Sequence, residues 1–478
     1  MKTIKFEDIG GVGDGNLQTG DGFDNAEAFQ RAIAAGEAGT AVLFKPGAKY
    51  KTTQQISVHN MSWFGDMNNP PVIFGWFDRP GRKIVGRSQD DDRKRGSIKG
   101  IRFHRCGPNP EHGILIDNME SFIFDGWVTA DAMADGEVRG GAIGISSFQP
   151  GNRPSSNVKV IARLTNSANF GVQYGNVDGG EMQVNAENCA REAIGIEPYC
   201  LGCLDFNQND VDSDALRLHD HSLKTGDPLI YVCMNDGSGI DGLPVPNYWF
   251  AIVIDRAHIR LAASKEDAAK GRAVRLGSIS SGLHRLLVCG VTKNIVIKDC
   301  RINNIDPPTE NRVRGLDGVV VLTATSGGYA ENISFKNVTV SDTSNRSVGF
   351  CVTWLGLWDI NLTGLKLDGG RIGGVRVGSG LLNGLRSSSG ELITPKRRTL
   401  VVPKGGRIVQ NRIERFPKYG IRIVQGTPDI SSNEINSGSR NATGIEIPAS
   451  ASEEMKRQVL ANRIRMALGQ SIGVSKVE

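Results

Sequence analysis

Apolar and polar residues alternate in short runs along most of the chain, and the runs recur at a fixed spacing. Three similar blocks begin 22 residues apart (188 − 166 and 210 − 188): 166–174, 188–196 and 210–218. Their apolar positions align in two columns, formed by Val172, Ile194 and Leu216 and by Tyr174, Ile196 and Leu218. Alternation with a period of two predicts strands with one buried face. A repeat of this length fits one coil of a parallel β-solenoid, in which coils stack about 4.8 Å apart.

A looser repeat continues downstream, in which an Asn opens a short strand and a Gly-apolar-x-apolar strand follows after a turn. Its copies begin at Asn332, Asn411, Asn433 and Asn462. Asn side chains at such turns can stack as a hydrogen-bonded ladder. A β-propeller needs periods of about 40–50 residues, so the repeat favours the solenoid over roughly residues 40–478.

The first coil of a solenoid exposes an unpaired edge and needs a cap. A helix is predicted from Asp24 to Ala35, with Asp24 and Glu27 in a capping-box arrangement and Gly36 ending it. Phe29 and Ile33 fall on one face of this helix and can cover the first coil.

The same N-terminal region resembles a known family. Residues 6–15, 24–33 and 42–50 are similar to the opening of pectate-lyase-like β-helix proteins, "G-A-x-G-D-G-x-x-D-D-x-x-A-x-Q-x-A-I" followed by "P-x-G-x-Y". That family contains pectinases, other polysaccharide hydrolases and lyases, epimerases and bacteriophage tailspikes. The resemblance implies an all-β fold, a single-stranded right-handed parallel β-helix that acts on a long glycan. We therefore expect an N-terminal segment with the capping helix at 1–40 and the β-helix at 41–478.

Composition narrows the class of protein further. Lys and Arg number 56 against 51 Asp and Glu, and a net charge of +5 is low for a dedicated nucleic-acid binder. The chain contains no stretch of eighteen apolar residues that could span a membrane. Residues 1–7 lack the apolar region of a secretory signal. Eight cysteines are too few for a disulfide scaffold, and Cys200 and Cys203 have no second ligand pair for zinc, so we expect no metal and no cofactor.

Candidate chemistry lies at the position before each Gly-apolar-x-apolar strand. In most coils this position holds an uncharged residue without catalytic chemistry. In four coils it holds Glu192, Asp214, His284 and Asp317. Because Glu192 and Asp214 are 22 residues apart, we expect them on adjacent coils, about 5 Å apart at the backbone. Such a pair suits glycosidic cleavage, in which one carboxyl is a general acid and the other a base; which is which stays open. Asp212 is expected to help position water.

The layout of these acids resembles that of polygalacturonases, whose motifs run "N-T-D-G", "D-D", "G-H-G" and "R-I-K". Residues 191–193, 213–214 and 282–285 correspond to the first three. Asp317 stands where the fourth would be.

Substrate contacts are expected beside the pair. Arg217 should face outward from its strand and can bind a sugar carboxylate, while His219 follows close by. Insertions near 222–250 and 262–272 interrupt the repeat and predict a groove wall and a short helix. Tyr248 and Trp249 in the first insertion could stack on sugar rings or pack the loop onto the coil.

These observations predict a polysaccharide depolymerase, most simply an endo-acting glycoside hydrolase. A polysaccharide lyase acting on a uronate and a non-catalytic glycan-binding β-helix are the alternatives. The missing signal and the resemblance favour a homotrimeric phage tailspike, or a secreted protein, that acts outside the cell. The glycan and the stereochemistry of cleavage stay open.

Overall fold

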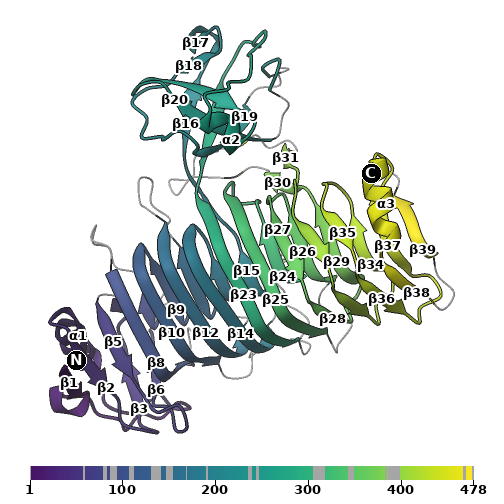
Figure 1. Cartoon of the computed structure of the whole chain (residues 1–478). Coiled ribbons are helices and arrows are strands. Elements are labelled where there is room, and N and C mark those ends of the chain that lie inside the picture. The colour runs from purple at the N-terminus through teal and green to yellow at the C-terminus, as the bar shows by residue number, and fades with distance from the viewer. Residues whose placement is uncertain are drawn as a thin grey trace.

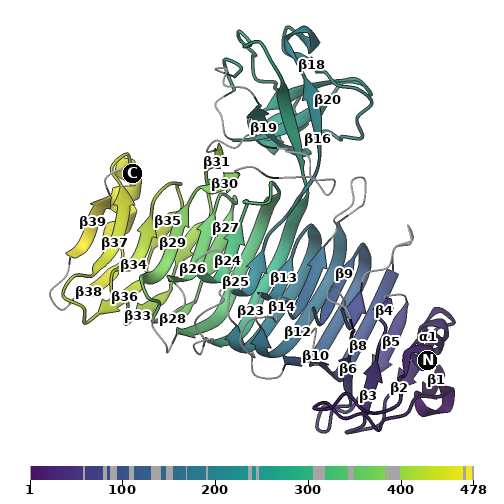
Figure 2. The same cartoon turned by 180° about the vertical axis from the view of Figure 1, so that it is seen from behind.

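The computed structural model describes residues 2–475 except 58–59, 79–82, 87–93, 107–111, 131–140, 147–153, 168–169, 190–191, 235–238, 244–246, 305–317, 343–348, 383–384, 386–393, 395–398 and 467–469. The described residues form an elongated body of stacked parallel strands, from which a smaller antiparallel unit projects (Figure 1; Figure 2). The N-terminus lies at one end of the body and the C-terminus at the other. None of the helices in the described part of the chain is long and apolar enough to cross a membrane.

The larger of the two parallel sheets, here called sheet A, has 18 strands. They are β1 (Lys2–Lys5), β2 (Thr40–Leu43), β3 (Lys49–Thr52), β5 (Met61–Phe64), β6 (Val72–Gly75), β8 (Lys94–Arg105), β10 (Met119–Ala130), β12 (Ser155–Ser167), β14 (Val177–Cys189), β23 (Val291–Asn304), β25 (Tyr329–Asp342), β27 (Ile360–Thr363), β28 (Lys366–Asp368), β32 (Arg407–Val409), β33 (Arg412–Glu414), β35 (Asp429–Ser431), β36 (Glu434–Ser437) and β38 (Arg463–Met466).

The second parallel sheet, here called sheet B, has 12 strands. They are β4 (Ile56–Ser57), β7 (Val85–Gly86), β9 (Ile114–Asp117), β11 (Ile143–Ser146), β13 (Phe170–Tyr174), β15 (Glu192–Ile196), β24 (Gly318–Thr323), β26 (Phe350–Leu355), β29 (Gly373–Gly378), β34 (Tyr419–Ile423), β37 (Thr443–Pro448) and β39 (Gln470–Ser475). A short pair, β30 (Gly380–Leu382) and β31 (Thr399–Val401), lies apart from both sheets.

Successive coils contribute parallel strands to both sheets, as a β-solenoid requires. In each later coil the chain forms two segments of sheet A that meet at a bend. The residue between the two segments has a positive φ. These corner residues are Asp299, Asn337, Gly364, Gln410 and Ser432. A left-handed backbone is accessible to Gly, Asn and Asp at little cost, which explains most of this column. The prediction of a mostly β chain with long parallel sheets is confirmed.

The interior of the solenoid is filled by the apolar positions of the repeat. Val172 and Ile194 are register partners, as predicted, and both are fully buried. The predicted Asn ladder also forms: Asn411 Nδ2 donates to Asn433 Oδ1 at 3.0 Å, and Asn433 Nδ2 donates to Asn462 Oδ1 at 2.7 Å. The ladder satisfies buried polar groups that the coils otherwise leave unpaired.

The predicted third member of the column, Leu216, lies elsewhere. The chain leaves the solenoid after β15 and forms a seven-stranded sheet, whose described strand pairs are antiparallel, before returning at β23. We call this the antiparallel unit; it consists of β16 (Cys200–Phe206), β17 (Val211–Asp212), β18 (Ala215–Arg217), β19 (Pro228–Cys233), β20 (Tyr248–Val253), β21 (His258–Ala262) and β22 (His284–Cys289). It has its own apolar core, which includes Leu216.

Three α-helices and two short 3-10 helices complete the described structure. The capping helix α1 (Ala26–Glu37) buries Phe29 and Ile33 as predicted, but its N-cap is Asn25 and Gly36 lies inside it, so the predicted capping box and stop are wrong. Asp24 instead accepts hydrogen bonds from the backbone of Ala26 and Thr53. The predicted short helix is α2 (Lys265–Ala269); α3 (Glu453–Leu460), η1 (Glu7–Ile9) and η2 (Gln208–Asp210) are the others.

Candidate functional site

The predicted acid pair is not a pair in the structure. Glu192 begins β15 in sheet B and is buried, whereas Asp214 lies in the turn between β17 and β18 of the antiparallel unit. Asp214 forms an ion pair with Arg260 at 3.2 Å. The predicted stacking of Asp214 on Glu192 in adjacent coils is therefore wrong.

The spacing of 22 residues that suggested the pair is a coincidence. The next coil after Ile194 contributes Val320, which follows it by 126 residues (320 − 194). The intervening chain builds the antiparallel unit, where the register partners of Leu216 are Val211 and Ile259. A hairpin in the unit thus reproduces the alternation of a coil without belonging to one.

The other predicted contacts on this hairpin lie on the surface of the antiparallel unit. Asp212, Arg217 and His219 are exposed. The Arg217 guanidinium pairs with Asp210 at 3.0 Å. Both views place β18 in the part of the unit farthest from the solenoid (Figure 1; Figure 2).

Three further candidates are packed inside the protein. His284 is fully buried; its Nδ1 accepts from the Tyr231 hydroxyl at 2.7 Å and its Nε2 donates to the Ser280 carbonyl at 2.9 Å. Tyr248 and Trp249 are also buried, so the packing role is the one that the structure supports for both rings. The fourth candidate, Asp317, lies outside the described residues.

Two other carboxylates are brought together at the edge of sheet A. In six successive coils one residue at the start of the sheet A strand has a positive φ, and strand register stacks these residues in a column. The column contains Asn157, Gly179, Asn294, Asn332, Asp359 and Gly405. Asn332 Nδ2 donates to Asn294 Oδ1 at 2.8 Å, and Asn294 Nδ2 donates to Asp178 Oδ1 at 3.2 Å. Asp359 is the carboxylate that replaces Asn in this column.

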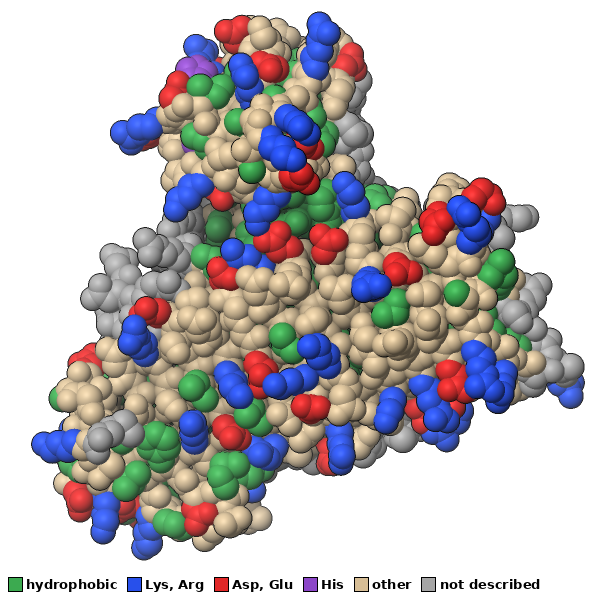
Figure 3. Space-filling model, viewed as in Figure 1, with side chains coloured by type: hydrophobic (Ala, Val, Ile, Leu, Met, Phe, Trp, Pro, Cys, Tyr) green, Lys and Arg blue, Asp and Glu red, His purple; other side chains and the backbone are tan. Residues whose placement is uncertain are grey.

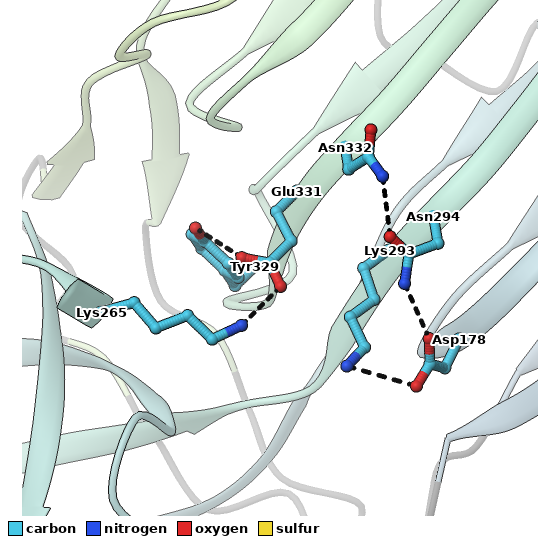
Figure 4. A network of polar contacts seen from close by, with 7 residues as sticks. All are labelled: Asp178, Lys265, Lys293, Asn294, Tyr329, Glu331 and Asn332. Atoms are coloured by element: carbon cyan, nitrogen blue, oxygen red, sulfur yellow. Dashed lines mark hydrogen bonds and ion pairs between the residues drawn. The ribbon is translucent and has the colours of Figure 1, made fainter. Parts of the chain in front are cut away.

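The residues one position earlier carry alternating charge (Figure 4). Asp178, Lys293 and Glu331 are successive register partners. Lys293 Nζ lies 3.2 Å from Asp178 Oδ2. Glu331 Oε1 instead pairs with Lys265 Nζ at 2.7 Å, and Lys265 belongs to α2. The antiparallel unit therefore contributes a cation to a carboxylate of the solenoid.

Asp359 and Glu331 lie on neighbouring coils and interact electrostatically. Burial raises the pKa of Asp359, the Glu331 carboxylate raises it further, and the Lys404 ammonium opposes both. The Tyr329 hydroxyl donates to Glu331 Oε2 at 3.4 Å. Gly405 follows Asp359 in the column with a φ of 66°, and a Cβ there would collide with Asp359 Oδ1. The glycine therefore leaves room for this carboxyl group.

An aromatic cluster lies next to the two carboxylates. Trp358 is buried and makes edge contacts with Tyr248 (5.3 Å between centroids) and Tyr329 (6.1 Å), while Phe250 lies 6.0 Å away. Lys404 Nζ lies 4.8 Å from the centroid of the Trp358 ring. Because Tyr248 and Phe250 come from β20, the cluster joins the antiparallel unit to the solenoid. Figure 3 shows a notch at this junction, where apolar side chains adjoin acidic and basic ones.

This arrangement suits proton transfer. The two carboxyl environments differ: Asp359 has a raised pKa, whereas Glu331 is ion-paired with Lys265. Such a difference assigns an acid and a base to neighbouring carboxyl groups. No group of three or more potential metal ligands occurs among the described residues.

The sequence carries a signal for this site. Asn332, which opens one copy of the looser repeat, belongs to this column, whereas Asn411, Asn433 and Asn462 belong to the Asn ladder. Glu331 directly precedes Asn332, and Asp359 follows 27 residues later (359 − 332) in the same register. A carboxylate at a position otherwise held by Asn or Gly distinguishes it from its neighbours.

No protein-family model matches the chain, and no curated protein matches it in sequence. Similar solved structures include the A-module of a mannuronan C-5 epimerase from Azotobacter vinelandii (11% identity, 99% of this chain and 97% of that one, TM-score 0.40). Others are the catalytic unit of a GH87 alpha-1,3-glucanase from Streptomyces thermodiastaticus (11%, 100% and 69%, 0.43) and the Dettilon tailspike protein (12%, 98% and 68%, 0.41). An epimerase, a glucanase and a tailspike are among the kinds of protein that the sequence resemblance named.

Proposed function

We propose that this protein is a carbohydrate-active enzyme, specifically a glycoside hydrolase that cleaves a polysaccharide at Glu331 and Asp359. The observation that carries the proposal is the raised pKa of Asp359 beside the ion-paired Glu331 on the adjacent coil. Hydrolysis of a glycosidic bond needs one protonated and one ionised carboxyl group on either side of the bond.

The roles follow from the two environments. Asp359 donates its proton to the glycosidic oxygen as the bond to the anomeric carbon breaks, and the leaving sugar departs as an alcohol. Glu331 either attacks the anomeric carbon as a nucleophile, forming a glycosyl-enzyme ester that water deprotonated by Asp359 then hydrolyses, or takes a proton from a water that attacks this carbon directly. Lys265 and Tyr329 hold the Glu331 carboxylate in position.

The test is digestion of a panel of bacterial capsular and extracellular polysaccharides, with pectins as controls. Reducing ends and the ultraviolet absorbance of unsaturated uronates are followed together. We expect reducing ends without absorbance, and a loss of about 10²–10⁴-fold in rate in Asp359→Asn and Glu331→Gln. Asn occupies the same backbone conformation in two preceding coils, Asn294 and Asn332, so Asp359→Asn should fold normally.

Three matched variants serve as controls. Asp178→Asn removes a carboxylate from the same edge of sheet A, and Glu192→Gln and Asp214→Asn alter the acids that the sequence alone suggested. All three should retain activity. Activity that survives in Asp359→Asn and Glu331→Gln would refute the proposed pair. Absorbance that rises with the reducing ends would make the enzyme a lyase.

The resemblance of the N-terminal region supports the wider setting. It predicts a right-handed coil, a homotrimer and action outside the cell, on a virion tail or as a secreted protein. Light scattering coupled to size-exclusion chromatography should then give the mass of three chains.

A further inference from the structure

A column of basic side chains runs along the segment of sheet A that follows the bend in each coil, away from the proposed catalytic pair. The register of ten successive coils places its members one above another. In order they are Arg102, Trp127, Arg163, Asn185, Arg301, Thr339, Lys366, Arg412, Glu434 and Arg463. This basic column holds six cations and one acid, and neighbouring members are about 4.8 Å apart at the backbone.

The side chains of the basic column point outward. Successive residues of a strand face opposite sides of the sheet. The residues that follow the column members in β23, β25 and β28 are Ile302, Val340 and Leu367, which are buried in the core. Arg301 and Lys366 themselves are exposed. The column is thus a surface feature along the solenoid.

Several of its charges are not neutralised. Arg163 pairs with Asp125 at 3.0 Å and Arg412 pairs with Glu414 at 2.8 Å. Arg301, Lys366 and Arg463 form no ion pair with any residue that the structure describes. Arg301 and Lys366 lie two coils apart with Thr339 between them, so their positive potentials add and an anionic ligand would be attracted to both.

The middle of the basic column is hollowed. A cavity of about 320 Å³ lies between Arg301 and Lys366, and the amides of Gln183 and Asn185 and the Thr339 hydroxyl also line it. One acid in the lining, Asp299, accepts a hydrogen bond from the Asn337 amide at 2.8 Å. Cations flanked by amides and hydroxyls match a sugar that bears an anionic group, because the neutral groups can bond its hydroxyls.

At the N-terminal end of the column, an aromatic ring contacts two of the cations. The Arg163 guanidinium lies 4.9 Å from the Trp127 ring centroid, and that of Arg102 lies 6.0 Å away. Arg102 Nε is buried and has no hydrogen-bond partner among the described residues. The ring thus fixes two guanidinium groups of the column in place.

We infer that the basic column is a second glycan site, which binds an acidic polysaccharide lengthwise through carboxylate, sulfate or phosphate substituents. The spacing of the coils is close to the length of one pyranose unit, so an extended chain can present its anionic groups to Arg301 and Lys366 two coils apart. The choice of a glycan as the ligand rests on the proposed function.

The test measures binding by affinity electrophoresis of the full chain carrying Glu331→Gln, which prevents cleavage. The probes are polygalacturonate, dextran sulfate, neutral dextran and duplex DNA. We expect polygalacturonate, dextran sulfate or both to retard the protein, and the retardation to weaken with added salt. Arg301→Gln with Lys366→Gln should weaken this binding by at least about tenfold.

The matched control is Lys5→Gln with Lys336→Gln, which removes the same charge from exposed positions outside the column and should bind like the parent. Unchanged binding in the Arg301 and Lys366 variant, or equal binding of neutral dextran or of DNA, would overturn the inference. Column-dependent binding by a protein that cleaves no glycan would contradict the proposed function and leave the second site standing. Loss of cleavage in Asp359→Asn, together with glycan binding that does not depend on the basic column, would support the proposed function and overturn the second site.

Discussion

Asp359 occupies a backbone position that Asn or Gly holds in the neighbouring coils. The left-handed conformation explains why those residues are there, but it does not explain an acid. Asp359 lies at an exposed position, yet desolvation by its surroundings and the nearby Glu331 carboxylate make ionisation costly and raise its pKa. A residue that destabilises the local fold is more easily explained by a role toward a substrate than by a structural role.

The first prediction at this scale concerns pH and activity. If Asp359 is the general acid, the rate falls as pH rises through its pKa. Lys404 lowers that pKa, so Lys404→Met should move the alkaline limb of the pH–rate profile to higher pH. Lys336→Met, which removes a distant cation, should leave the profile unchanged. A limb that stays in place or moves down in Lys404→Met would contradict the role of Asp359.

The second prediction concerns stability. The pKa of Asp359 is raised in the folded state, so its contribution to stability is fully present below the unfolded value of about 3.9 and is lost as pH rises through the folded value. Asp359→Asn cannot ionise. Its melting temperature relative to the wild type should therefore be higher at pH 7 than at pH 3.5. An equal difference at both pH values, measured by calorimetry, would argue against a perturbed carboxyl group.

Individual side chains were the level at which sequence reasoning failed. Glu192 and Asp214 fitted the repeat in spacing and in residue type, yet strand pairing puts them in different sheets. Glu331 and Asp359 are 28 residues apart (359 − 331) rather than 22, because the coil that connects them is longer than the repeat. Only the register of the strands shows that they are neighbours.

Secondary-structure elements were more predictable, because they depend on local patterns. The alternation of apolar residues predicted the strands, and the spacing of Phe29 and Ile33 predicted the buried face of α1. The Asn ladder was also predictable, since its members recur at the start of each late coil. The antiparallel unit was not, because its strands have the same alternation as those of the solenoid and nothing local marks their direction.

The ladder supports a third prediction. Asn433 donates two hydrogen bonds from Nδ2, to Asn462 Oδ1 and to the Ile408 carbonyl, and its Oδ1 accepts from the backbone and side chain of Asn411. Asn433→Ala leaves these buried partners unsatisfied and should destabilise the protein by at least about 2 kcal/mol.

The control for the ladder is Asn361→Ala, at a half-buried position on the outer side of β27 where no side-chain hydrogen bond forms with described residues. Chemical denaturation of both variants provides the comparison. Equal midpoints would mean that the ladder is not stabilising.

The whole molecule consists of a long solenoid and a side unit joined by an aromatic cluster. Coils of a solenoid touch mainly their neighbours, so a local change should remain local. The joint is different, because Trp358 of the solenoid contacts Tyr248 and Phe250 of the antiparallel unit.

The fourth prediction tests this joint. Trp358→Ala should cost about 3–5 kcal/mol of local stability and speed amide exchange in β20, while β36 and β38 remain protected. Trp63→Ala, which removes a fully buried ring near α1, is the matched control and should affect only the N-terminal coils. Slow exchange in β20 of the Trp358 variant would show that other contacts hold the unit.

The antiparallel unit leaves and rejoins the solenoid at a single point. Cys200 and Cys289 are register partners at its base, and the Gly290 amide donates to the Tyr199 carbonyl at 2.8 Å. Residues 200–289 could therefore be exchanged for a short turn, or for another domain, without altering the order or register of any coil. During synthesis the same arrangement imposes a delay, because β14 must wait for more than a hundred further residues before β23 can pair with it. The unit could thus be replaced without changing the solenoid, and its synthesis delays the pairing of the coils on either side of it.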